Sequence, residues 1–102
     1  MAKVEIVESL FEEIEKKFKQ RATRIYDLID ALENNPHKGK PLGSVGGIVI
    51  KEIKFEGFRF YFLADGYKLK FFKEEDLVDL LIRFVRMSDK KHQKETIKEI
   101  KR

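Results

Sequence analysis

The stretch IVIKEIKFEGFRFYFLADG, residues 48–66, decides the fold of this chain. Both of its halves are rich in β-branched and aromatic residues, and the EG pair at 56–57 between them predicts a tight turn. In the second half three phenylalanines alternate with Arg59, Tyr61 and Leu63, so the two sets lie on opposite sides of a strand. We expect the phenylalanines to face a core and the other side to carry cations and an aromatic ring.

The pattern continues toward the C-terminus as further strands. The DG pair at 65–66 predicts a second hairpin turn, YKLKFF at 67–72 a third strand, and KEED at 73–76 a wider polar turn. Residues 74–87 also show helical spacing, but their composition favours a strand over about Leu80 to Met87. The last residues, SDKKHQKETIKEIKR, predict a helix with Ser88 or Asp89 as its N-cap.

Toward the N-terminus the period of the apolar residues becomes helical. KVEIV at 3–7 predicts a short strand, and Ser9 with Glu12 three residues later fits a capping box. Two apolar stripes follow, and the residues alone permit one long helix or a helical hairpin broken near Gln20 to Thr23. Asn34-Asn35-Pro36 ends the helical region because proline cannot continue it.

Between the helices and the strands lies NPHKGKPLGSVGG, residues 35–47, which superficially resembles a phosphate-binding loop. It matches neither the Walker nor the Rossmann spacing of glycines. It also follows a helix C-terminus, whereas anions bind at helix N-termini. We therefore interpret it as a turn-rich connection to the sheet, with Lys38 and Lys40 as supporting charge for any polyanion.

Composition limits the classes of protein that remain. The 102 residues form one domain, 1–102, and 42% of them are hydrophobic, enough for a core. There is no cysteine, and the two histidines lie far apart, so no zinc signature is present and we expect no metal and no cofactor. No apolar run is long enough for a membrane span, and we expect a cytoplasmic protein without a membrane partner.

The charge of +4 is unevenly distributed along the chain. Residues 1–47 hold eight basic and eight acidic side chains, so the whole excess lies in residues 48–102. Basic segments beside a compact domain are typical of proteins that bind polyanions. A solvated, charged C-terminal helix explains the same composition, and charge alone does not separate the two interpretations.

Two segments together resemble a known family. ALENNPHKGKPLG followed by IVIKEIKFEGFRFYFL, and the closing IRFVRMSDKKHQKETIKEI, are similar to the RelE/ParE superfamily of toxins from toxin–antitoxin pairs, with HigB-like features at the C-terminus. The resemblance covers nearly the whole chain. It implies an α+β fold with an N-terminal helical hairpin packed on an antiparallel, twisted sheet, a meander of about four strands, and a short C-terminal helix. We expect the helices to pack on one face of the sheet.

The resemblance implies an mRNA endoribonuclease that acts at the ribosome, and a cognate antitoxin protein as partner. Cleavage without a metal needs a base, an acid and cations at the phosphate. The residues that match the family's catalytic positions are Lys54, Arg59, Arg86 and His92, of which His92 is the acid–base candidate. The residues expected to contact RNA are Lys51, Tyr61, Arg83, Lys90, Lys91 and Lys94.

The chain also departs from the family pattern. Glu52 stands where a second basic residue is common, Met87 stands where an arginine is common, and the threonine-proline before the last helix is missing. These departures leave open a ParE-like gyrase inhibitor without catalysis, or a degenerate toxin that acts only as a protein-binding module.

Overall fold

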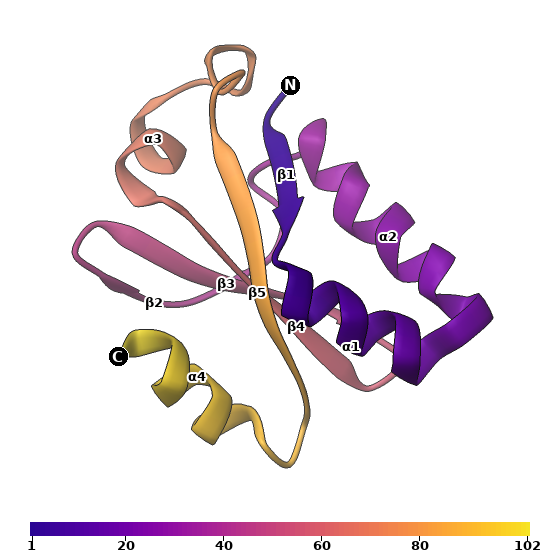
Figure 1. Cartoon of the computed structure of the whole chain (residues 1–102). Helices are drawn as coiled ribbons and strands as arrows, with labels where there is room; N and C mark the ends of the chain where they lie inside the picture. Colours follow the sequence, from indigo (N-terminus) through magenta and orange to yellow (C-terminus); the bar gives the residue numbers. More distant parts are fainter.

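The computed structural model describes residues 1–102 and shows an α+β fold built on one five-stranded sheet (Figure 1). The strand order is β1-β5-β4-β3-β2; β1 pairs with β5 in parallel and all other pairs are antiparallel. None of the helices is long and apolar enough to cross a membrane. The elements are β1 (Lys3–Ile6), α1 (Glu8–Phe18), α2 (Ala22–Asp30), β2 (Lys40–Val45), β3 (Ile48–Phe55), β4 (Phe58–Asp65), α3 (Gly66–Phe71), β5 (Leu81–Asp89) and α4 (Gln93–Lys101).

The central hairpin of β3 and β4 confirms the tight turn predicted at the EG pair. Glu56 and Gly57 have φ angles of 46° and 84°, and Phe55 pairs with Phe58 across the turn. Two consecutive positive φ angles give the turn the twist of the strands that it joins.

The sheet has two covered faces. We call the face that packs on α1 and α2 the hairpin face, after the helical hairpin that these two helices form, and we call the opposite face, which packs on α4, the α4 face. On the hairpin face, Phe60, Phe62 and Phe84 are fully buried in one apolar cluster with residues of α1 and α2. Phe58 is half-buried there and packs edge-to-face on Phe18, with ring centroids 5.2 Å apart. The three phenylalanines of β4 therefore face the helices, as their alternation predicts.

The helices before the sheet form the expected hairpin. A 3₁₀ turn over Lys19–Arg21 separates α1 from α2, and Lys19 has a φ of 50° that breaks the helix. The predicted capping box is wrong, because α1 starts at Glu8 and Ser9 lies inside it. The start is fixed by Val7, whose N–H donates to the carbonyl of Phe84 and whose carbonyl accepts from Phe11.

The predicted hairpin turn at residues 65–66 and the strand at 67–72 are also wrong. Asp65 instead caps α3, since its side chain accepts from the N–H of Lys68 at 3.1 Å. The N–H of Gly66 donates to the carbonyl of Gly47 at 2.9 Å, which ties α3 to the β2–β3 turn. An aspartate before a glycine suits a helix N-cap as well as a turn, and here the tertiary contact selects the helix.

The fourth strand of the meander comes from the stretch predicted as an irregular connection. Lys40–Val45 forms β2 and pairs with β3, with a register shift between Pro41 and Gly43. A short, bulged edge strand carries a weak sequence signal because it has little apolar alternation. The meander is therefore β2-β3-β4-β5.

The C-terminal part confirms the closing strand and the short helix but not the position of that helix. β5 runs to Asp89, so neither Ser88 nor Asp89 is the N-cap of α4; His92 takes that place. The helix lies on the side of the sheet away from α1 and α2, so the expectation of helices on one face is wrong (Figure 1). Ile97 and Ile100 are half-buried, and Ile50 is buried on this α4 face.

Candidate functional site

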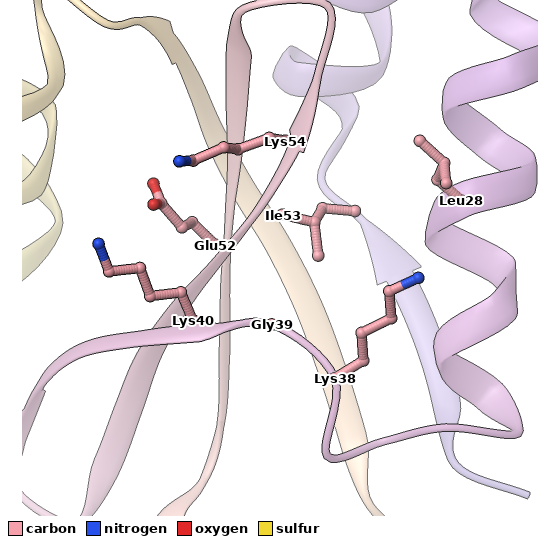
Figure 2. A pocket seen from close by; sticks show the side chains of 7 residues that line it. All are labelled: Leu28, Lys38, Gly39, Lys40, Glu52, Ile53 and Lys54. Carbon is pink, nitrogen blue, oxygen red and sulfur yellow. The ribbon is translucent and has the colours of Figure 1, made fainter.

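Basic side chains gather at the open edge of β3 (Figure 2). A cavity of about 290 Å³ is lined by Lys38, Lys40, Lys54 and Glu52, and we call it the lysine pocket. Lys40 and Lys54 flank the carboxylate of Glu52, whereas Lys38 points toward α2 (Figure 2). Lys40 is the first residue of β2 and pairs with Glu52, so β3 has no neighbour on this side beyond that point. Because no strand pairs with β3 beyond Glu52, the edge of β3 is open there, and the lysine pocket lies along this open edge.

Gly39 fixes the path of the chain between the first two lysines of the pocket. Its φ is 108°, and a Cβ atom built on it would lie 2.8 Å from the Cζ atom of Phe62 and 3.2 Å from the backbone oxygen of Glu52. Both the backbone conformation and the close contact require glycine. Lys38 and Lys40 are thereby held at the pocket by a tight passage over the core.

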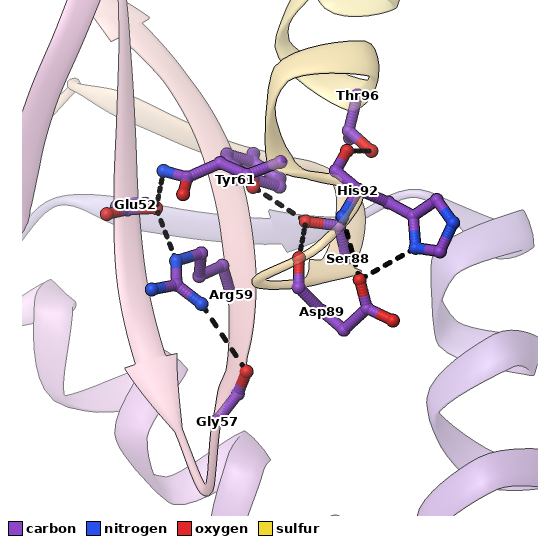
Figure 3. A network of polar contacts seen from close by, with 9 residues as sticks. Glu52, Gly57, Arg59, Tyr61, Ser88, Asp89, His92 and Thr96 are labelled. Atoms are coloured by element: carbon purple, nitrogen blue, oxygen red, sulfur yellow. Dashed lines mark hydrogen bonds and ion pairs between the residues drawn. The ribbon is translucent and has the colours of Figure 1, made fainter.

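A buried ion pair borders the lysine pocket (Figure 3). Arg59 Nε lies 3.7 Å from Glu52 Oε2, and the two side chains are 10% and 1% exposed. Gln93 on α4 donates to the same carboxylate oxygen at 3.3 Å, and Arg59 donates to the carbonyl of Gly57 at 3.4 Å. Glu52 Oε1 and Arg59 Nε have no hydrogen-bond partner. Arg59 is therefore neutralised inside the protein.

Tyr61 lies beside this ion pair and is fully buried. Its hydroxyl lies 2.7 Å from Ser88 Oγ, and Ser88 Oγ donates to the carbonyl of Asp89. Burial raises the pKa of the Tyr61 phenol. The ring expected to contact RNA is thus covered on the α4 face.

His92 lies in the turn between β5 and α4, apart from the lysine pocket. Its Nδ1 lies 2.8 Å from Asp89 Oδ1, which also accepts from the His92 backbone N–H at 2.9 Å. The hydrogen bond from His92 lowers the pKa of Asp89. The ring points away from Arg59 (Figure 3) and lines a groove of about 230 Å³ with Lys17 and Phe58.

The remaining sequence-predicted cations of the α4 face are exposed. Lys54 is opposite Arg59 in the strand register, so these two of the residues predicted to be catalytic do lie side by side. Arg86 lies 3.8 Å from Glu99 on α4, and Arg83 lies 3.2 Å from Glu5 on β1. Lys90, Lys91 and Lys94 are exposed before and at the start of α4.

Lys51 is separated from this set by the alternation of β3. It pairs with Phe62 on the hairpin face and is buried, with 6% of its surface exposed. Its ammonium donates to the carbonyl of His37 at 2.9 Å, and burial lowers the pKa of the amine.

The structure adds two features that sequence reasoning undervalued. Lys38 and Lys40, interpreted from the sequence as supporting charge, line the same pocket as Lys54, and Glu52 is the carboxylate that lines it. Their convergence depends on the register of Lys40 with Glu52, which no local pattern specifies. No group of three or more histidine, cysteine, aspartate or glutamate side chains is arranged to hold a metal ion.

A scan against protein-family models and a search of curated proteins find no match for this chain. Among solved structures, it is similar to a chain of the archaeal RelE–RelB complex from Pyrococcus horikoshii OT3, with a TM-score of 0.64 and 15% sequence identity. The match covers 86% of this chain and 93% of that chain. A likeness at this identity concerns the backbone arrangement. The chain therefore shares its fold with this chain of the RelE–RelB complex.

Proposed function

We propose that this chain is the toxin of a toxin–antitoxin pair and that it cleaves mRNA at the ribosome in the cytoplasm. The observation that supports this most is the lysine pocket: three lysines line one strand edge, with Lys40 and Lys54 on the side of Glu52 and Arg59, on a RelE fold (Figure 2). Clustered cations of this kind bind the phosphate backbone of nucleic acids.

The chemistry proposed for the pocket is transesterification within the RNA. The 2′-oxygen attacks the adjacent phosphorus, the bond from phosphorus to the 5′-oxygen of the next nucleotide breaks, and the products are a 2′,3′-cyclic phosphate and a 5′-hydroxyl. Lys40 and Lys54 compensate the negative charge that grows on the phosphorane. Arg86, Arg83 and the lysines at the start of α4 contact the backbone further along.

Two protons must move in this reaction. Glu52 is the only carboxylate that lines the pocket, so we assign it the proton of the 2′-hydroxyl. Its side chain is 1% exposed and paired with Arg59, so this role requires the ion pair to open when RNA binds. We assign His92 the proton of the leaving oxygen. Because its ring faces the neighbouring groove, this role requires the turn from Asp89 to His92 to rearrange when RNA binds.

The similar Pyrococcus horikoshii chain occurs in a RelE–RelB complex. We propose by analogy that an antitoxin protein binds this chain and silences it.

Two observations favour a second candidate, a ParE-like gyrase inhibitor or a degenerate toxin without catalysis. Arg59 is buried and paired with Glu52, and His92 lies outside the lysine pocket. A protein that only binds a partner needs neither an exposed arginine nor a positioned histidine.

The experiment that separates the candidates is expression of the chain and of its variants in bacteria, with the ends of all mRNAs mapped after induction. The nuclease is expected to arrest growth and to leave 2′,3′-cyclic phosphate ends in codons at the ribosomal A site. Lys54→Met and Arg86→Ala should relieve the arrest while remaining folded, and Lys73→Met, outside the pocket, should not. Growth arrest with DNA damage and intact mRNA would favour the gyrase inhibitor.

A further inference from the structure

A second cavity lies on the hairpin face, beyond the helices that cover the rest of it. It has a volume of about 530 Å³ and lies between the β2–β3 pair and α3. Its basic side chains are His37, Lys51 and Lys70, and its apolar walls include Val49 and Leu69. We call it the Lys51 pocket. The proposed RNA chemistry makes no use of it.

The charge of Lys51 is unusual because no carboxylate accompanies it. The ammonium has three N–H donors, and one of them bonds to the carbonyl of His37. The nitrogen also lies 5.9 Å from the centre of the Phe62 ring, but no acidic side chain is within 4.0 Å of it. Buried lysines are normally paired, since removing an ammonium from water is costly.

The other polar side chains at this pocket are engaged in contacts of their own. Glu74 lies 3.6 Å from Nδ1 of His37, whose Nε2 lies 2.9 Å from the carbonyl of Leu69. Lys70 lies over the ring of Phe71 at 5.4 Å. The pocket therefore has a further lysine and a histidine around Lys51 and no anion of its own that pairs with it.

The outer surface beside this pocket is apolar and aromatic. Tyr67 and Phe71 on α3 are 64% and 62% exposed, with ring centroids 4.9 Å apart, and Phe72 is 40% exposed. Exposed aromatic groups of this size commonly mark a site of protein association. Because α3 also contributes Leu69 and Lys70 to the pocket, one bound segment can reach both features.

We propose that the Lys51 pocket and the aromatic side chains of α3 form one docking surface for an acidic, amphipathic segment of a protein partner, whose Asp or Glu carboxylate enters the pocket and pairs with Lys51. The proposal rests on the part of the proposed function that gives this chain an antitoxin, and it is independent of RNA cleavage.

The chemistry of the pocket favours a carboxylate over the phosphates of RNA. RNA backbones are bound by exposed, hydrated cations, and the lysine pocket offers those. Lys51 is buried among apolar groups, and burial lowers its pKa. A single carboxylate on an apolar stem enters such a site at a lower desolvation cost than a charged, polymeric backbone.

The first test uses small anions with the whole chain, followed by NMR signals of the Lys51 side chain and the Val49 methyl groups. Sodium propionate is expected to shift these signals saturably, and more strongly than inorganic phosphate at equal ionic strength. Lys51→Met should weaken the binding about tenfold, the size of one lost charge-assisted contact. Lys73→Met is the control, because it removes an exposed lysine nearby that does not line the pocket.

The second test uses two synthetic helical peptides, one of leucine and glutamate and one of leucine and glutamine. The glutamate peptide should displace propionate, and both Lys51→Met and Phe71→Ser should weaken its binding. Equal binding of the two peptides, no effect of Lys51→Met, or stronger shifts with phosphate or oligo-uridine RNA would overturn the proposal. These outcomes leave the cleavage experiments unaffected, because no readout involves cut RNA.

Discussion

The two faces of the sheet are both buried, but they are built from different chemistry. The hairpin face is apolar beneath the helices: Phe60, Phe62 and Phe84 interlock with α1 and α2. The α4 face holds the ion pair of Glu52 and Arg59 under a helix whose apolar residues, Ile97 and Ile100, are only half-buried. Both faces come from the same alternation along β3 and β4.

The difference indicates that one face stabilises the fold and that the other serves the proposed function. Apolar burial of about 25 cal/mol per Å² stabilises the fold, and the hairpin face supplies most of it. A buried ion pair with unpartnered atoms adds little or nothing to stability, so its presence needs another reason. We attribute it to the proposed function, in which the α4 face carries the cations and the carboxylate of the chemistry.

The largest expected effect comes from breaking the hairpin face. Phe60→Ala leaves a cavity in the packed core and should lower the free energy of unfolding by about 3–5 kcal/mol. Tyr61→Phe, the next residue on the same strand, removes only the hydroxyl at Ser88 and should cost about 0.5–1.5 kcal/mol. Denaturant unfolding of both variants measures the difference. Equal losses would contradict the contrast between the faces.

Glu52→Gln is expected to separate stability, binding and chemistry on the α4 face. The unpaired Arg59 should lower the free energy of unfolding by about 1–3 kcal/mol. RNA should bind more tightly, because a negative charge leaves the lysine pocket, while cleavage falls about 100-fold or more for lack of the base. Anisotropy with labelled RNA and a cleavage assay check the two effects.

Glu56→Gln is the matched control for this substitution. It removes a carboxylate from the turn of the same hairpin, where Glu56 pairs with Arg21 on the surface. If Glu52→Gln cleaves RNA at the rate of the parent chain, Glu52 is not the base of the reaction.

Alkaline pH provides a smaller test, of burial at Tyr61 and Tyr26. Burial is the largest cause that raises the pKa of Tyr61 on the α4 face and of Tyr26 on α2 above the ordinary value of 10.0. Both groups stay protonated in the folded chain while the unfolded chain loses its protons. Stability should therefore be constant with respect to these groups below pH 10.0 and fall above it.

Tyr61→Phe should remove part of this alkaline loss, and Tyr26→Phe another part. Denaturant unfolding at several values of pH, with each variant compared with the parent, measures the slopes. A slope that stays the same in both variants would show that other groups cause it.

The smallest expected effect concerns the attachment of α4. Ile97→Ala removes one of two half-buried apolar contacts and should cost about 1 kcal/mol or less. Because so little apolar surface holds the helix, its amides should exchange with solvent much faster than those of β4. Hydrogen exchange detected by NMR compares the two elements, and equal protection would mean that α4 is held as firmly as the core.

Much of this fold could be predicted from the sequence because its signals are local. The phenylalanines of β4, the turn at Gly57 and the closing strand all follow from alternation and turn chemistry. The strand β2 and the helix α3 could not be predicted, because the first depends on pairing with β3 and the second on the contact between Gly66 and Gly47.

The candidate site was predictable only in part. Lys54 and Arg59 come together because they are cross-strand partners in the β3–β4 hairpin, and the two-residue turn of this hairpin fixes the register. The placement of Lys38 and Lys40, the burial of Arg59 and the orientation of His92 depend on long-range packing around Gly39 and α4. No pattern within a few residues specifies these.

The most direct measurement of the central claim is cleavage of one RNA in a translating extract, with and without a single 2′-deoxy nucleotide at the cut position. We predict one cut that leaves a 2′,3′-cyclic phosphate. This cleavage should persist in EDTA added after ribosomes are stalled, and it should disappear with the 2′-deoxy nucleotide or with Lys54→Met. Cleavage of the 2′-deoxy RNA at the same rate, or no cleavage by the parent chain, would contradict it.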